Sequence, residues 1–215
     1  MFGVACLGGG TCCAQTNATF FFDAGRSSFD ARKYALALSN FTTFVELNPQ
    51  YADGYCYCGM SKWWLGDYSG AVTDYDKAIS LNPKCGGYYC NRGQTKFVLK
   101  MVPEALADYN KSIEIDSKNA EAYFNRGTLK MLGLTNYTEA VADFTKALEI
   151  HSDPHEDDIF FWRGNARLQL KDYNGSIADF SKCLELNPNS ESSHVVMTNL
   201  ATARELLRQS KQQSP

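Results

Sequence analysis

The fold is decided by residues 52–85, ADGYCYCGMSKWWLGDYSGAVTDYDKAISLNPKC, because closely similar stretches recur along the chain. Successive glycines of this pattern are 34, 34, 34 and 37 residues apart, at Gly25, Gly59, Gly93, Gly127 and Gly164. A period in the thirties is typical of one supersecondary unit that is copied along the chain, each copy being too small to bury its apolar face alone. The sequence therefore predicts a repeat array.

Aligning the chain on these glycines gives five copies, at residues 18–51, 52–85, 86–119, 120–156 and 157–190. An aromatic residue stands at the fourth place of every copy, and a second aromatic column follows at Phe41, Tyr75, Tyr109, Phe144 and Phe180. Within a copy the apolar residues follow a helical spacing, and Asn82-Pro83 ends the second run because proline disfavours helix at the residue before it. Since Gly66-Asp67 interrupts the pattern midway, each copy is expected to form two short antiparallel helices.

This pattern resembles the tetratricopeptide repeat, a 34-residue helix-turn-helix motif. The resemblance covers residues 18–190 and implies an all-α, right-handed superhelical solenoid of about five repeats. Beyond it, residues 192–209 are typical of one amphipathic helix. The end of a solenoid exposes a face that must be covered, so we expect residues 191–215 to form a capping helix and a tail.

Residues 1–17 lie outside the array and carry no charge. Up to Ala14 they resemble the end of a secretory signal peptide, although the positively charged leader of such peptides is missing. They hold too few apolar residues to span a membrane. A truncated start, a disordered tail or a lipid-modified cysteine are alternatives. We favour export, to a periplasm or the medium, over a cytoplasmic location.

Cysteine usage does not settle the compartment. Cys56 and Cys90 share one column of adjacent copies, and Cys85 lies in the connector between them. A disulfide or redox role is one interpretation. Free thiols that pack as small apolar residues are the one we prefer.

Two charged columns suggest how the copies are joined. An aspartate recurs in the second helix, and an arginine stands just before the glycine of the first helix in copies three to five. Pairing inside a copy would leave Asp74 without an arginine, because the second copy has Cys58 at that place. We therefore expect ion pairs across repeat boundaries, namely Asp74 with Arg92, Asp108 with Arg126 and Asp143 with Arg163.

The resemblance implies that the first helices line a concave groove that binds an extended peptide or a partner helix, through the fifth, sixth, ninth and twelfth places of each copy. The candidate peptide-binding residues are Tyr57, Met60, Trp63, Asn91, Gln94, Phe97, Phe124, Asn125, Thr128 and Trp162. Asn91 and Asn125 have amides suited to a peptide backbone, and the aromatic residues are candidate apolar anchors. For Phe97 and Phe124, packing between helices is an equal alternative. The lysine and arginine set by which some family members clamp the carboxylate tails of heat-shock chaperones is absent from these columns.

The sequence favours a non-catalytic scaffold whose partner is a protein or peptide. Its net charge of −3 gives no basic footprint for nucleic acid, and no motif for a catalytic residue, a cofactor or a metal pair is present. One alternative is a metal-binding or enzyme-accessory role for the loop 151–158, which contains His151 and His155 and, on our alignment, the three-residue insertion of the fourth copy. Another is a structural subunit of an envelope assembly.

Overall fold

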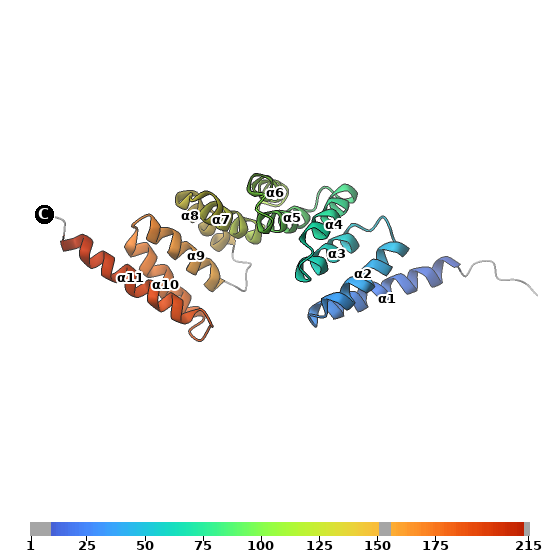
Figure 1. Cartoon of the computed structure of the whole chain (residues 1–215), viewed down its shortest axis with the longest axis horizontal. Coiled ribbons are helices and arrows are strands. Elements are labelled where there is room, and N and C mark those ends of the chain that lie inside the picture. The colour runs from blue at the N-terminus through green and yellow to red at the C-terminus, as the bar shows by residue number, and fades with distance from the viewer. Residues whose placement is uncertain (1–9, 151–155, 213–215) are drawn as a thin grey trace, which may run out of the picture. The chain divides into compact units, whose positions relative to one another are not determined.

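The computed structural model describes residues 10–150 and 156–212, with side chains from Ala18 onward. Over these ranges the chain forms eleven α-helices and no strand (Figure 1). The all-α prediction is therefore confirmed. None of the helices in the described part of the chain is both long and apolar enough to cross a bilayer.

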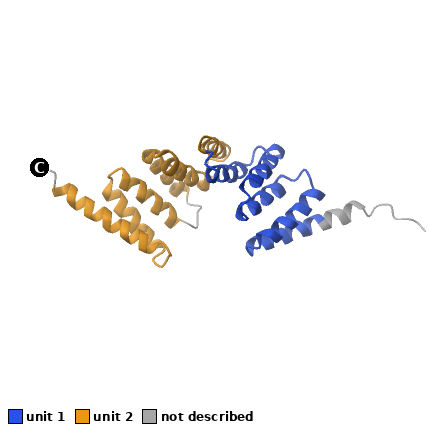
Figure 2. Cartoon of the chain, in the orientation of Figure 1, with its two compact units in different colours: residues 1–101 blue, residues 102–215 orange. Residues whose placement is uncertain are grey.

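The chain divides into two compact units, residues 1–101 and 102–215 (Figure 2). Unit 1 contains α1 (Gly10–Asp30), α2 (Tyr34–Leu47), α3 (Ala52–Trp64), α4 (Tyr68–Leu81) and α5 (Gly86–Val98). Each helix packs against the next one along the chain, and α3 also touches α5. Helix α1 begins inside the segment 1–17 that the sequence sets apart from the array.

Unit 2 contains α6 (Val102–Ile115), α7 (Ala120–Leu134), α8 (Tyr137–Ile150), α9 (Glu156–Gln169), α10 (Tyr173–Leu186) and α11 (Ser193–Gln212). Neighbours along the chain again pack together, and α9 also touches α7 and α11. Helix α11 therefore packs on the array as the first helix of a further copy would. Its buried residues are Ser193, Val196, Leu200 and Ala203.

The recurrent glycines let the two helices of a hairpin approach closely. A methyl group on Gly127 would lie 2.9 Å from Cε1 of Phe144, and one on Gly164 would lie 2.9 Å from Cε1 of Phe180. Both rings are fully buried. Gly25 is in the same relation to Phe41 in unit 1. The glycine column and the second aromatic column therefore recur together because each glycine makes room for one ring.

The hairpin turns share a left-handed residue. Positive φ angles occur at Arg32, Gly66, Lys100, Thr135 and Lys171. This residue follows the copy's glycine by seven positions in four copies, but Thr135 follows Gly127 by eight. One of the three extra residues of the fourth copy thus lies in its hairpin turn, and the assignment of the whole insertion to residues 151–158 is wrong.

Side chains at the turns fix where the second helices begin. The Asp67 carboxylate accepts a hydrogen bond from the backbone N–H of Gly70 at 2.9 Å, and Asp172 accepts one from Gly175 at 3.0 Å. Asn136 does the same for Glu139. Each bond satisfies a backbone donor that the first turn of a helix leaves without a partner.

Candidate interaction groove

The predicted groove residues all lie on the first helices of their hairpins. In unit 1 these helices are α3, with Tyr57, Met60 and Trp63, and α5, with Asn91, Gln94 and Phe97. In unit 2 they are α7 and α9, with the residues Phe124, Asn125, Thr128 and Trp162. All ten side chains are half-buried.

In unit 1 the aromatic candidates take part in packing. The Tyr57 ring stacks on Phe41 at a centroid distance of 4.9 Å and meets Phe22 edge-on at 5.5 Å. Tyr57 therefore joins the first two hairpins. Trp63 contacts the rings of Trp64 and Tyr68, and its buried indole N–H has no hydrogen-bond partner among the described residues.

Asn91 uses its amide inside the protein. Its Nδ2 donates to Sγ of Cys56 at 3.5 Å, which links α5 to α3. Burial raises the pKa of the Cys56 thiol to about 12, so the sulfur stays protonated at neutral pH. The cysteines whose side chains the structure describes are not joined in disulfides, namely Cys56, Cys58, Cys85, Cys90 and Cys183.

In unit 2 some of the candidate residues pack in the core, and one of them lines a pocket. Phe124 packs against Phe144 at a centroid distance of 5.9 Å, in the core cluster between α7, α8 and α9. The Thr128 hydroxyl donates to the backbone oxygen of Phe124 in its own helix. Trp162 also borders this cluster, but it lines an open pocket as well.

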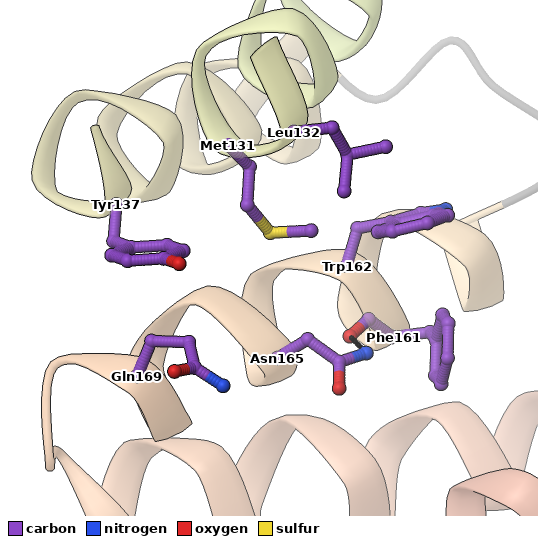
Figure 3. Close-up of a pocket in the computed structure, with 7 residues that line it drawn as sticks. All are labelled: Met131, Leu132, Tyr137, Phe161, Trp162, Asn165 and Gln169. Atoms are coloured by element: carbon purple, nitrogen blue, oxygen red, sulfur yellow. Dashed lines mark hydrogen bonds between the residues drawn. The ribbon is translucent and has the colours of Figure 1, made fainter. Parts of the chain in front are cut away.

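This pocket, the α7–α9 pocket, has a volume of about 360 Å³. Its lining consists of Met131, Leu132, Tyr137, Phe161, Trp162, Asn165 and Gln169. Figure 3 shows the side chains of α9 facing those from the end of α7 and the start of α8, with Met131 directed toward Trp162. None of the described residues that line it carries a charge.

Sequence reasoning placed Met131, Phe161 and Asn165 in the inner columns but missed three other lining residues. Leu132 and Tyr137 flank the hairpin turn between α7 and α8, and Gln169 ends α9. The longer spacing from Gly127 to Phe144 was the available signal, because it shows that the fourth copy carries an extra residue in this turn.

A second cavity lies in unit 1 and has a volume of about 430 Å³. Its lining consists of Ala18, Thr19, Phe22, Asp23, Phe44, Asn48 and Tyr51. It includes none of the predicted peptide-binding residues, and it carries the exposed acid Asp23. The two units therefore present chemically different cavities.

The ion pairs differ from those predicted. Arg126, for which the prediction names Asp108, forms a bidentate pair with Asp143, with Nε at 3.0 Å and Nη2 at 2.6 Å from the carboxylate oxygens. Arg163 binds Asp179 in the same way, at 3.1 and 2.8 Å, instead of Asp143. In unit 2 the arginine beside the glycine thus pairs with a carboxylate on the second helix of its own hairpin, and the predicted pair of Asp143 with Arg163 is wrong.

Asp74 is paired with a base from a column of the first helices that sequence reasoning missed. Lys62 lies one helical turn after Cys58, and its Nζ is 2.8 Å from Oδ2 of Asp74. The same place carries Lys130, which contacts Asp143 at 2.9 Å, and Arg167, which contacts Asp179 at 2.8 Å. The recurrence of this column, at Lys62, Lys96, Lys130 and Arg167, was visible in the sequence.

Each arginine does cross the boundary, but to a different column. Nη1 of Arg92 is 2.6 Å from Oδ1 of Asp76, so this predicted partner of Asp74 binds the acid two residues further on. Nη1 of Arg126 donates to Asn110, and that of Arg163 donates to Thr145. These arginines also lie over the aromatic ring three residues earlier, at about 5.4 Å for Arg126 over Tyr123.

Two expectations fall on residues that the structure does not describe. His151 and His155 of the loop 151–158 lie outside the described residues, as do the side chains of residues 1–17. Within the described residues there is no group of three or more His, Cys, Asp or Glu side chains able to hold a metal ion.

Helical hairpins that pack one after another along the chain define a helical-repeat protein. The chain belongs to the tetratricopeptide repeat family. The family model described as "TPR repeat" matches residues 102–133, and two models described as "Tetratricopeptide repeat" match residues 158–190 and residues 55–85 and 120–153. No curated relative matches the sequence.

Solved structures share the fold at low sequence identity. A thermophilic TPR protein of Thermus thermophilus is 18% identical with a TM-score of 0.69, over 86% of this chain and 98% of that one. MamA from Desulfovibrio magneticus RS-1 is 21% identical with a TM-score of 0.67, over 82% and 98%. YrrB, described as a TPR protein with an unusual peptide-binding site, is 18% identical with a TM-score of 0.62, over 83% and 90%. Family and fold together make this chain a protein-interaction scaffold.

Proposed function

We propose that the α7–α9 pocket receives one uncharged, apolar side chain of a peptide segment from a partner protein, and that the chain acts as a non-catalytic interaction module. The observation that carries this proposal is the composition of the pocket. Three aromatic residues, a methionine and a leucine surround two amides, with no charge among them. A volume of about 360 Å³ lies within the range of ligand pockets, roughly 300–1,000 Å³.

The lining selects against charged side chains. Moving a charge from water into an apolar pocket is unfavourable unless a partner of opposite sign is present there. An apolar side chain is stabilised by about 25 cal/mol for each Å² of apolar surface that it buries. Trp162 and Met131 are the expected main contacts, since aromatic residues and methionine are enriched at the centres of interfaces.

The two amides suit the backbone of an extended peptide. Gln169 is exposed at the rim and offers both a donor and an acceptor. Asn165 donates to the backbone oxygen of Phe161 at 2.9 Å, which holds its side chain along α9. The description of YrrB as a TPR protein with a peptide-binding site supports peptide recognition on this fold.

The proposal is tested by selecting peptides from a random heptapeptide phage library on the full chain. We expect the selected peptides to share one uncharged apolar position, and Trp162→Ala or Met131→Ala to weaken each synthetic peptide about tenfold, as a loss of about 1.4 kcal/mol does.

Leu186→Ala is the matched control, because Leu186 is an exposed leucine of α10 outside the pocket lining. Its affinity for the peptides should equal that of the unaltered chain. Selected peptides that bind Trp162→Ala and Met131→Ala as tightly as the control would place the binding site elsewhere and overturn the proposal.

A further inference from the structure

Side chains of helix α11 contact two residues of α9 that line the α7–α9 pocket. The first is Asn165, whose Oδ1 accepts a hydrogen bond from Nδ2 of Asn199 at 2.9 Å. Because Asn165 also donates to the backbone oxygen of Phe161, its amide is fixed from both ends. The orientation of this lining residue therefore depends on a side chain of α11.

The second residue is Phe161. It packs against the core cluster of Phe180, Cys183, Val196 and Leu200, of which the last two belong to α11. The Phe161 ring also meets Trp162 edge-on at a centroid distance of 5.5 Å. Packed contacts thus run from α11 through Phe161 to Trp162 in the pocket.

The attachment of α11 is one-sided. It contacts α10 and, to a smaller extent, α9, and it buries one narrow stripe of residues. Val195 and Met197 remain 49% and 51% exposed. Near its other end, a cavity of about 460 Å³ separates Leu207 and Ser210 from the start of α10. A helix whose contacts within the described residues come mainly from one neighbour, α10, is expected to open at a lower free energy than the array as a whole.

We propose that docking of α11 controls the α7–α9 pocket, so that the pocket is formed when α11 is docked and loosens when it is not. The effect of this docking on peptide binding rests on the proposed function. A peptide that prefers the docked state stabilises α11, and by linkage docked α11 strengthens binding of the peptide by the same factor. Helix α11 then acts as a regulatory element as well as packing on α9 and α10.

The first experiment needs no ligand. In the full chain with Trp63→Phe and Trp64→Phe, Trp162 is the single tryptophan. We expect Asn199→Ala and Val196→Ala to shift its fluorescence emission toward that of a solvated indole and to increase quenching by acrylamide. Far-UV circular dichroism reports whether the array stays folded, and Asn199→Ala keeps the test valid if Val196→Ala melts.

Thr198→Ala is the control, because Thr198 is exposed on α11 and, among the described residues, its hydroxyl donates to the backbone oxygen of His194 in the same helix. Emission and quenching for Asn199→Ala that match those of Thr198→Ala would overturn the coupling.

The second experiment uses a heptapeptide selected on the α7–α9 pocket. At saturation it should slow amide hydrogen exchange in residues 193–212, and Asn199→Ala should weaken its binding roughly two- to tenfold, the effect of one net hydrogen bond. If a peptide binds while neither quantity changes, the coupling fails and the proposed function stands. If no peptide binds, the proposed function fails, and the Trp162 measurements alone decide the coupling.

Discussion

Gly59 lies against the ring of Tyr75, so closely that a methyl group on Gly59 would be 2.8 Å from Tyr75 Cε1. Tyr75 is only 2% exposed, and its ring is enclosed by the core of unit 1. The ring cannot swing into solvent to relieve such a contact. The separation of α3 from α4 is therefore set by the absence of a side chain at Gly59.

We predict that Gly59→Ala destabilises the protein, although alanine is favoured over glycine inside a helix by about 1 kcal/mol. The added methyl group forces the hairpin apart, and overpacking of this kind costs about 1–3 kcal/mol. Gly87→Ala is the control, because its methyl group would meet only Cys85 Sγ at 3.8 Å. Thermal unfolding followed by circular dichroism should give a lower Tm for Gly59→Ala alone. Equal Tm values for the two variants would contradict the packing role.

The fold was predictable because a repeat displays its main physical requirements several times along the chain. The spacing from Gly59 to Tyr75 recurs from Gly25 to Phe41, and the proline after Asn82 recurs after Asn48. Chance agreement of several columns in register is improbable, so the helical hairpin follows from the sequence alone. Periodicity does not state which neighbouring copy a column faces. For that reason the sequence did not predict that Arg126 forms its bidentate pair with Asp143 of its own hairpin.

The site was less predictable, because lining and packing residues share the same columns. Tyr57 and Trp162 occupy the sixth place of their copies, yet the ring of Tyr57 stacks on Phe41 while Trp162 lines a pocket. The difference arises from the size of the surrounding side chains, since large rings fill the space around Tyr57 in unit 1. A sequence column records the place of a residue but not the volume left around it.

The carboxylate of Asp179 is expected to contribute strongly to stability. It is 3% exposed and receives both Arg163 and Arg167. We predict that Asp179→Ala lowers the free energy of unfolding by about 3 kcal/mol, because two guanidinium groups lose their buried counter-charge.

Glu185→Ala provides the comparison, since Glu185 pairs with Lys182 on the surface and is 69% exposed. Its loss should change stability by no more than about 0.5 kcal/mol. Urea denaturation of the two variants checks both values. Similar midpoints for Asp179→Ala and the unaltered chain would show that the buried pair has no net effect.

The turn between α3 and α4 requires a left-handed residue at Gly66, where φ is 84°. No atom lies within 4 Å of a methyl group added there, so Gly66→Ala changes only the backbone energy. We expect a loss of about 1 kcal/mol, because an L-residue with a Cβ is disfavoured in this conformation. Gly66→Asn should cost less, since asparagine tolerates the left-handed region better. Chemical denaturation of both variants tests the order, and a Gly66→Ala variant as stable as Gly66→Asn would refute the explanation.

Buried thiols should make the protein less stable at alkaline pH. Burial raises the pKa of the Cys58 thiol from 9.0 to about 12. Below pH 9 the thiol is protonated in both the folded and the unfolded state, and its contribution to stability is fully present. Between pH 9 and 12 it ionises only in the unfolded state, which then binds fewer protons, so stability falls as the pH rises. From pH 8 to pH 10 this one thiol accounts for a loss of about 1.4 kcal/mol.

The variant Cys58→Ala lacks the group, and its free energy of unfolding should fall by that much less over the same interval. Urea denaturation of both proteins at the two pH values measures the difference, and parallel losses would show that Cys58 ionises as readily in the folded chain as in the unfolded one.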